Sequence, residues 1–75
     1  MSKPTRITNS IRALRFARGE MTQAELAQRI GVTRQTIIAI EQGRYSPSLE
    51  VAFQIARVFK VSLDEVFQYP DGKSR

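Results

Sequence analysis

The stretch from Gln23 to Gly43, QAELAQRIGVTRQTIIAIEQG, constrains the fold of this chain most, because it contains two short helical patterns separated by one glycine turn. In the first pattern, Leu26 and Ile30 lie one turn apart on a single helix face. In the second, Ile37 and Ile40 form an i, i+3 apolar stripe. The connection is so short that the two helices must meet at a steep angle with these residues between them. The stretch therefore predicts a helix-turn-helix.

Capping residues define where the two helices begin and end. Thr22 followed by Glu25 has the spacing of a capping box, in which the hydroxyl accepts from a free backbone N–H and the carboxylate reaches back. Gly31 should end the first helix, because glycine adopts the left-handed conformation without a steric penalty. Thr33 then caps the second helix, and Gly43 ends it.

Three more helices are expected around this pair, from capping residues and apolar spacing. One begins at Asn9 or Ser10 as its cap and runs to Arg18, and a longer one is capped by Ser48. A short one begins at Ser62, which repeats the capping-box spacing with Glu65, and runs through Phe67. The expected core face of the longer helix comprises Leu49, Ala52, Phe53, Ile55, Ala56 and Phe59. The predicted fold class is all-α, a compact five-helix domain with the helix-turn-helix at helices two and three.

The ends of the chain are expected to lie outside this domain. Residues 1–8 carry Lys3 and Arg6 but little to bury, so they are interpreted as a flexible basic N-terminal arm. Residues 70–75 are interpreted as a flexible tail. The folded domain is therefore predicted to span residues 9–69.

Composition narrows the chemistry that such a small domain can perform. The 75 residues include 12 basic and 7 acidic ones, and this arginine-rich excess indicates an anionic partner, with a solvated basic face as the alternative. Cysteine and histidine are both absent, which removes disulfides, thiolate or imidazole metal sites and the usual nucleophile and base pairs. We therefore expect a cytoplasmic protein that is not an enzyme and has no metal, no other cofactor and no membrane partner.

The run from Gln23 to Gly43 resembles the DNA-binding segment of the XRE-type helix-turn-helix regulators, the class of the lambdoid phage repressor and Cro proteins. The shared markers are Gln23, small Ala27 where the helices cross, Gly31 in the turn, Ile37 and Ile40 in the core, and Glu41 with Gly43 at the end. Residues 45–49, the apolar stripe after them and residues 61–67 are also similar to short single-domain members. The resemblance implies a DNA-binding domain and a transcriptional regulator, with repression as its expected effect.

The second helix of the motif is expected to enter a major groove, because its packing residues leave short or polar side chains on the other side. Arg34 and Gln35, at its N-terminal end, are the leading base readers: arginine matches O6 and N7 of guanine, and glutamine matches N6 and N7 of adenine. Ala39 offers only a methyl contact to thymine, where some phage relatives have a hydrogen-bonding side chain. Ile38 either makes a similar contact or is partly buried against the fourth helix or the loop.

Phosphate contacts are expected on both flanks of the motif. The resemblance implies that Gln23 is a phosphate clamp, at a helix N-terminus where free N–H groups and the dipole favour an anion. Thr33, Arg44 and Tyr45 are predicted to hold the strand on the other flank, although Tyr45 also fits a packed loop residue. The N-terminal arm either touches phosphates or a minor groove, or is inert.

Three arginines of the first helix, Arg12, Arg15 and Arg18, are spaced three apart and share one flank, which by itself indicates a solvated stripe. The resemblance implies a structural ion pair, buried or half-buried, between Arg15 and Glu41. Removing one partner of such a pair leaves a stranded charge in a low dielectric.

One domain of this size covers little DNA, so binding to an operator is expected to need a homodimer, whose reading helices would lie about 34 Å apart. The subunit contact is predicted at residues 67–69 or at the fifth helix. The alternative is an antitoxin or adaptor that uses the same fold as a protein-interaction module, supported by an exposed Ile38 and residues 67–69.

Overall fold

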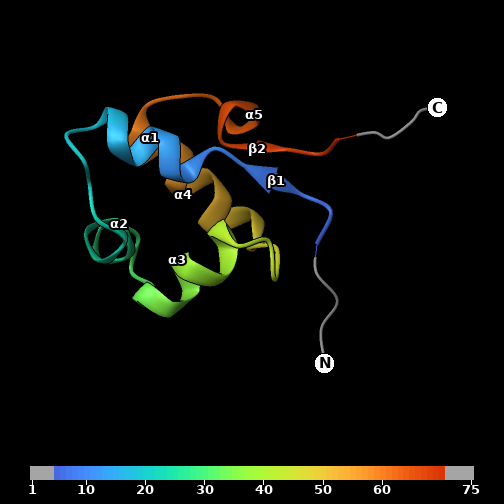
Figure 1. Cartoon of the computed structure of the whole chain (residues 1–75), viewed down its shortest axis with the longest axis horizontal. Helices are drawn as coiled ribbons and strands as arrows, with labels where there is room; N and C mark the ends of the chain where they lie inside the picture. The colour runs from blue at the N-terminus through green and yellow to red at the C-terminus, as the bar shows by residue number, and fades with distance from the viewer. Residues whose placement is uncertain (1–4, 71–75) are drawn as a thin grey trace.

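Five helices and one short pair of strands make up the computed structural model, which describes residues 5–70 (Figure 1). In chain order they are β1 (Thr8–Asn9), α1 (Ile11–Ala17), α2 (Gln23–Ile30), α3 (Arg34–Glu41), α4 (Leu49–Phe59), α5 (Leu63–Val66) and β2 (Phe67–Gln68). α2 packs against α3 and α4, and α5 packs against α4 and β2. Figure 1 shows α2 and α3 at one end of the molecule and the strand pair with α5 at the other. The predicted five-helix arrangement is confirmed, and the strand pair is an addition to it.

The two helices of the motif begin and end where their capping residues predict. Thr22 Oγ1 accepts from Glu25 N at 3.0 Å, and Glu25 Oε1 accepts from Thr22 N at 2.8 Å, so the capping box is complete. Gly31 ends α2 in the left-handed conformation with φ of 78°. Thr33 Oγ1 then accepts from Thr36 N at 3.1 Å at the start of α3. Local sequence signals therefore set where α2 ends and where both helices begin.

The start of α5 differs from the prediction. Ser48 caps α4 as expected, with its hydroxyl accepting from Val51 N at 3.2 Å. Ser62 makes no such cap, and its hydroxyl instead donates to Asp64 Oδ1 at 2.6 Å. The N–H of Glu65, which a capping hydroxyl would bind, donates to the backbone carbonyl of Ser62 at 3.1 Å instead. α5 is also one residue shorter than expected, because Phe67 has extended backbone angles and belongs to β2.

The strand pair joins the two ends of the domain. β1 and β2 are antiparallel, with Thr8 opposite Gln68 and Asn9 opposite Phe67. Thr8 falls within residues 1–8, the predicted arm, so the folded domain begins before the predicted boundary at residue 9. The pairing depends on main-chain hydrogen bonds between residues far apart in sequence, which burial patterns do not reveal. Residues 1–4 and 71–75, the outer parts of the predicted arm and tail, lie outside the described residues.

The core lies where the helices meet, and most of its members are the apolar residues that define the helical patterns. The buried cluster comprises Ile11, Met21, Leu26, Ala27, Ile30, Ile37, Ile40, Ile55, Ala56, Phe59 and Val66. Leu26 and Ile37 are completely inaccessible, one from each helix of the motif. Because interiors are close-packed, these contacts fix the angle between α2 and α3.

The core face of α4 is rotated relative to the face that the sequence predicts. Leu49 and Phe53 were expected on this face, yet they are 72% and 52% exposed. They lie one turn apart on one flank of the buried stripe, at about 100° of rotation per residue. The opposite flank, with Val51 and Val58, is partly buried instead. α4 is therefore rotated so that its valines pack and two of its large hydrophobic side chains face solvent.

None of the helices within residues 5–70 is both long enough and apolar enough to cross a membrane. In the same described part of the chain, no three His, Cys, Asp or Glu side chains are grouped so that they could hold a metal ion.

Candidate nucleic-acid interface

The outer face of α3 presents its long polar side chains at its N-terminal turn. Arg34 and Gln35 are both exposed there, directly after the capping Thr33. Ile38 and Ala39, the other two predicted base readers, are half-buried one turn further along. The first turn of α3 is therefore free to reach a partner. For Ile38, partial burial was one of the two alternatives.

An ion pair at the C-terminal end of α3 connects this helix to α1. Arg15 Nε donates to Glu41 Oε2 at 2.7 Å and Arg15 Nη2 to Glu41 Oε1 at 3.2 Å, so the guanidinium forms a two-point fork on the carboxylate. Arg15 Nη1 also donates to Met21 O at 2.8 Å. The Arg15 side chain is 9% exposed and that of Glu41 10%, so the pair is nearly shielded from water. The structural pair implied by the family resemblance is thus present.

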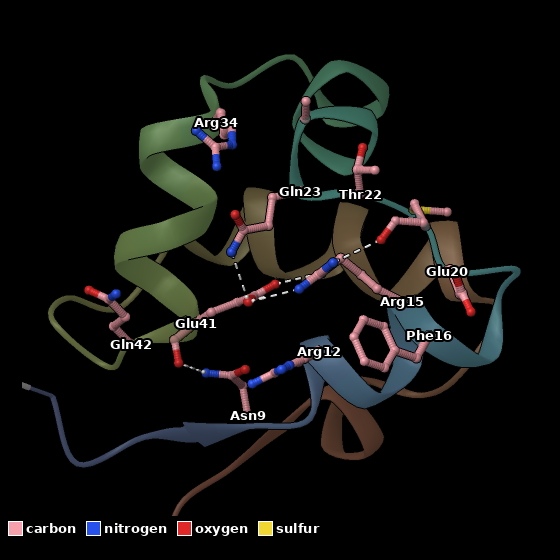
Figure 2. A pocket seen from close by; sticks show the side chains of 12 residues that line it. Asn9, Arg12, Arg15, Phe16, Glu20, Thr22, Gln23, Arg34, Glu41 and Gln42 are labelled. Carbon is pink, nitrogen blue, oxygen red and sulfur yellow. Dashed lines mark hydrogen bonds and ion pairs between the residues drawn. The ribbon is translucent and has the colours of Figure 1, made fainter.

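Gln23, the predicted phosphate clamp, contacts the same carboxylate. Its Nε2 donates to Glu41 Oε1 at 3.2 Å, and the side chain is half-buried. This bond orients the amide between α2 and α3, as Figure 2 shows. The side-chain oxygen and one amide hydrogen remain for a ligand, beside the first N–H groups of α2, which have no intrahelical partner. An anion at this place would also be favoured by the positive end of the helix dipole.

An open pocket of about 720 Å³ lies between α1, the start of α2, and α3 (Figure 2). It is lined by Asn9, Arg12, Arg15, Phe16, Glu20, Met21, Thr22, Gln23, Ala24, Arg34, Glu41 and Gln42. The pocket joins Arg34, a predicted base reader, to Gln23. It also contains Arg12 and Gln42, to which sequence reasoning assigned no role in binding. Their only sequence signal was position: Arg12 shares a flank with Arg15, and Gln42 follows Glu41.

The chain before α1 holds the end of α3 in place. Asn9 Nδ2 donates to Ile40 O at 3.0 Å, and Thr5 N donates to Gly43 O at 3.1 Å. Ile40 O also accepts from Gly43 N at 3.0 Å, so Asn9 adds a second bond to a carbonyl at the end of α3, and Thr5 binds the chain directly after it. Sequence reasoning considered Asn9 only as a cap for α1, and no local pattern pointed to its contact with α3.

The remaining predicted phosphate contacts lie outside the pocket. Arg44 is exposed and Tyr45 is 37% exposed, both in the loop after α3. Thr33 lies at the other end of α3, and its hydroxyl is 3.0 Å from the hydroxyl of Thr36 in addition to its capping bond. The structure therefore places the predicted contacts at three separate points around α3.

Comparison with known proteins establishes the family. A helix-turn-helix family model matches residues 11–66, so this chain belongs to the helix-turn-helix family. An uncharacterized HTH-type transcriptional regulator of Methanocaldococcus jannaschii is 55% identical over 53 residues, which cover 71% of this chain and 80% of that protein. The regulator YgzD of Bacillus subtilis, named in the same way, is 44% identical over 59 residues, covering 79% of this chain and 88% of its own length.

A phage protein and a solved structure extend the comparison. The cryptic phage CTXphi transcriptional repressor RstR of Vibrio cholerae is 37% identical over 59 residues, which cover 79% of this chain and 52% of the repressor. The crystal structure of a proposed DNA-binding protein from Bacteroides fragilis matches with a TM-score of 0.71, covering 83% of this chain and 98% of that one. Its 22% identity supports a shared fold alone. The resemblance to XRE-type regulators is confirmed by these matches.

Proposed function

We propose that this protein binds double-stranded DNA in a sequence-specific manner and regulates transcription, as a repressor. The observation that carries the proposal is the exposed first turn of α3, where Arg34 and Gln35 stand next to the polar pocket at the start of α2. The names of the relatives, which include transcriptional regulators and a phage repressor, support the same function. A regulator of this kind acts on cellular DNA without catalysis, so we also propose a cytoplasmic location and no enzymatic activity.

Base reading is assigned to four side chains of α3. Arg34 pairs with O6 and N7 of a guanine and Gln35 with N6 and N7 of an adenine, each discriminating by about 1 to 3 kcal/mol. Ile38 and Ala39 are half-buried and short of polar atoms, so they offer only apolar contact to a thymine methyl. Specificity should therefore be concentrated in the bases that face the first turn of α3.

Phosphate binding is assigned to the groups around α3. Gln23, already oriented by Glu41, clamps one phosphate at the N-terminus of α2. Thr33 holds the backbone at the N-terminal end of α3, and Arg44 and Tyr45 hold it beyond the C-terminal end, where Arg44 supplies a full positive charge. Such contacts fix the register of the protein on the duplex and make affinity depend on salt.

We propose that the protein acts as a homodimer, because a single small module buries only about 600 to 1,000 Å² against DNA. An open pocket of about 370 Å³ lies beside β2, lined by Ile7, Leu63, Asp64, Phe67, Gln68 and Tyr69. Tyr69 is 66% exposed at its edge. This surface coincides with the segment at residues 67–69 that the sequence singles out for a subunit contact.

The same surface supports the alternative function, an antitoxin or adaptor that binds another protein through this fold. Exposed aromatic side chains such as Tyr69 are common at protein interfaces. The alternative has less support at α3, because Ile38 is half-buried rather than exposed.

Selection from a random duplex library separates the two functions. The enriched duplex and a scrambled one of equal length are compared by fluorescence anisotropy at about 150 mM salt. A DNA regulator should prefer the enriched duplex by about 1,000-fold or more. Weak binding with equal affinity for both duplexes would favour the protein-interaction module.

A further inference from the structure

Two arginines on one flank of α1 and the arginine that follows its last residue have three different environments. Arg15 is buried in the fork with Glu41, and Arg18 Nη2 donates to Phe59 O at 2.7 Å, where it satisfies a carbonyl at the end of α4. Arg12 is exposed and makes no hydrogen bond or ion pair to any other residue within 5–70. The flank is therefore not a uniform solvated stripe, and only one of its charges remains available to a ligand.

Arg12 is held against an exposed aromatic ring. Its Cζ lies 5.5 Å from the centroid of the Phe16 ring, within the range of a cation–π contact. Phe16 is 53% exposed, so it contributes little to the core. Because the ring attracts the guanidinium, it restricts the conformations that the long Arg12 side chain samples.

Both residues line the pocket that also contains the proposed DNA-binding groups. Figure 2 shows Arg12 and Phe16 on α1 and Arg34 on α3, on different walls of this pocket. The Glu41 carboxylate on its floor is already paired with Arg15 and Gln23, so it does not neutralise Arg12. Apart from the Arg15–Glu41 pair, the charged side chains that line the pocket are Arg12, Arg34 and Glu20. Two positive charges therefore face one negative charge. An anion is the ligand that this charge pattern favours.

We propose that Arg12 binds a backbone phosphate of the DNA that α3 reads, and that Phe16 is its positioning residue. The inference rests on the proposed function and extends the DNA footprint from the helix-turn-helix to α1. A phosphate contact carries no sequence information. Arg12 therefore contributes to affinity and to its salt dependence, and the preferred sequence is set by α3 alone.

Salt titration of binding tests the role of Arg12. Affinity for the enriched duplex is measured by fluorescence anisotropy at several salt concentrations for wild type, Arg12→Ala and Arg57→Ala. The slope of log K against log salt should become shallower by about 0.9 in Arg12→Ala, the value for one phosphate contact. Arg57, an exposed arginine on α4 that does not line the pocket, is the matched control and should leave the slope unchanged.

A double-mutant cycle tests the role of Phe16. Phe16→Leu keeps an apolar side chain but removes the ring, and should weaken binding by about two- to fivefold, whereas Phe16→Tyr should not. Arg15 Cζ also lies 5.8 Å from the centroid of the Phe16 ring, so in the Arg12→Ala background Phe16→Leu should have a smaller effect than in wild type. Both positions are exposed, so each variant should fold like wild type. Circular dichroism checks this.

The outcomes distinguish this inference from the function on which it rests. If Arg12→Ala changes the slope no more than Arg57→Ala, the phosphate contact is wrong, while specific binding by wild type would still uphold the regulator. If Phe16→Leu weakens binding equally with and without Arg12, its positioning role is wrong. Equal affinity of wild type for enriched and scrambled duplexes would overturn the regulator itself.

Discussion

The carboxylate of Glu41, on α3, accepts hydrogen bonds from Arg15 of α1 and from Gln23 of α2. This one residue therefore links three helices. A buried pair of this kind is not by itself strongly stabilising, since both charges lose hydration. Its value lies in geometry, because the two oxygens fix where three helices meet. Gln23 in turn is oriented toward the pocket by the same group, so structure and binding share this residue.

Removing the Glu41 carboxylate should therefore be costly. In Glu41→Ala the guanidinium of Arg15, which is 7% exposed overall, is left without its partner, and we expect a loss of about 3 to 5 kcal/mol in the free energy of unfolding. Urea denaturation followed by circular dichroism measures this loss. Glu50→Ala is the control, because Glu50 is exposed on α4 and its removal should cost less than about 1 kcal/mol. Similar losses in the two variants would contradict the structural role of the pair.

At the scale of elements, helix ends are where the sequence predicts best. Gly31 and Lys60 both end helices in the left-handed conformation, with φ of 78° and 59°. Gly31 tolerates this geometry, whereas Lys60 has a side chain that makes it unfavourable. A Cβ at position 31 would meet nothing within 4 Å, so a substitution there strains only the backbone.

This difference predicts opposite effects at the two helix ends. Gly31→Ala should lower stability by about 1 to 2 kcal/mol, and Lys60→Gly should raise it by about 0.5 to 1 kcal/mol. For a domain of this size, about 1 kcal/mol corresponds to a shift of about 4 to 8 °C in Tm. Thermal unfolding of both variants checks the signs. A stabilised Gly31→Ala, or a destabilised Lys60→Gly, would contradict the assigned backbone conformations.

The elements that sequence reasoning missed depend on contacts between distant segments. Capping boxes and glycines predicted α2 and α3 because each signal lies within a few residues of its effect. The β1–β2 pair joins residues about 60 positions apart, such as Thr8 and Gln68. No local sequence pattern predicts this pairing. Leu49 and Phe53 were placed in the core because periodicity gives a stripe but not its exact rotation. Which flank is buried depends on the neighbouring helices.

The candidate site, like the fold, could be predicted only in part from the sequence. The side chains at the start of α3 follow from which residues pack inward, so Arg34 and Gln35 could be named from the sequence. The pocket between α1, α2 and α3 could not, because it arises from how three helices pack. Arg12 and Asn9 acquire their positions only in that arrangement.

At the scale of the whole molecule, the proposed reading face and the proposed subunit contact lie at opposite ends. Figure 1 shows α2 and the start of α3 on the opposite side of the molecule from β2 and α5, whereas the end of α3 lies near β1. A dimer formed at residues 67–69 would leave both α3 helices free to face DNA. Two-fold symmetry would then require a two-fold symmetric operator with half-sites about one helical turn apart.

Loss of the aromatic side chain at the edge of β2 should disrupt this dimer. Tyr69→Ser should weaken self-association by about tenfold or more, since it removes apolar area from the proposed contact. Phe53→Ser is the matched control, because Phe53 is also an exposed aromatic but lies on α4. Sedimentation equilibrium of the free proteins measures the effect. If Phe53→Ser dissociates the dimer and Tyr69→Ser does not, the subunit contact lies on α4.

The central claim, that the first turn of α3 reads the bases, is tested most directly by selecting duplexes from a random library with wild type, Arg34→Ala and Gln35→Ala in parallel. Wild type should enrich a two-fold symmetric motif. Arg34→Ala should lose its preference for guanine at one position of each half-site, and Gln35→Ala its preference for adenine at another, each by about 1 to 3 kcal/mol. If both variants enrich the same motif as wild type with the same preferences, the assignment of α3 as the reading helix is wrong.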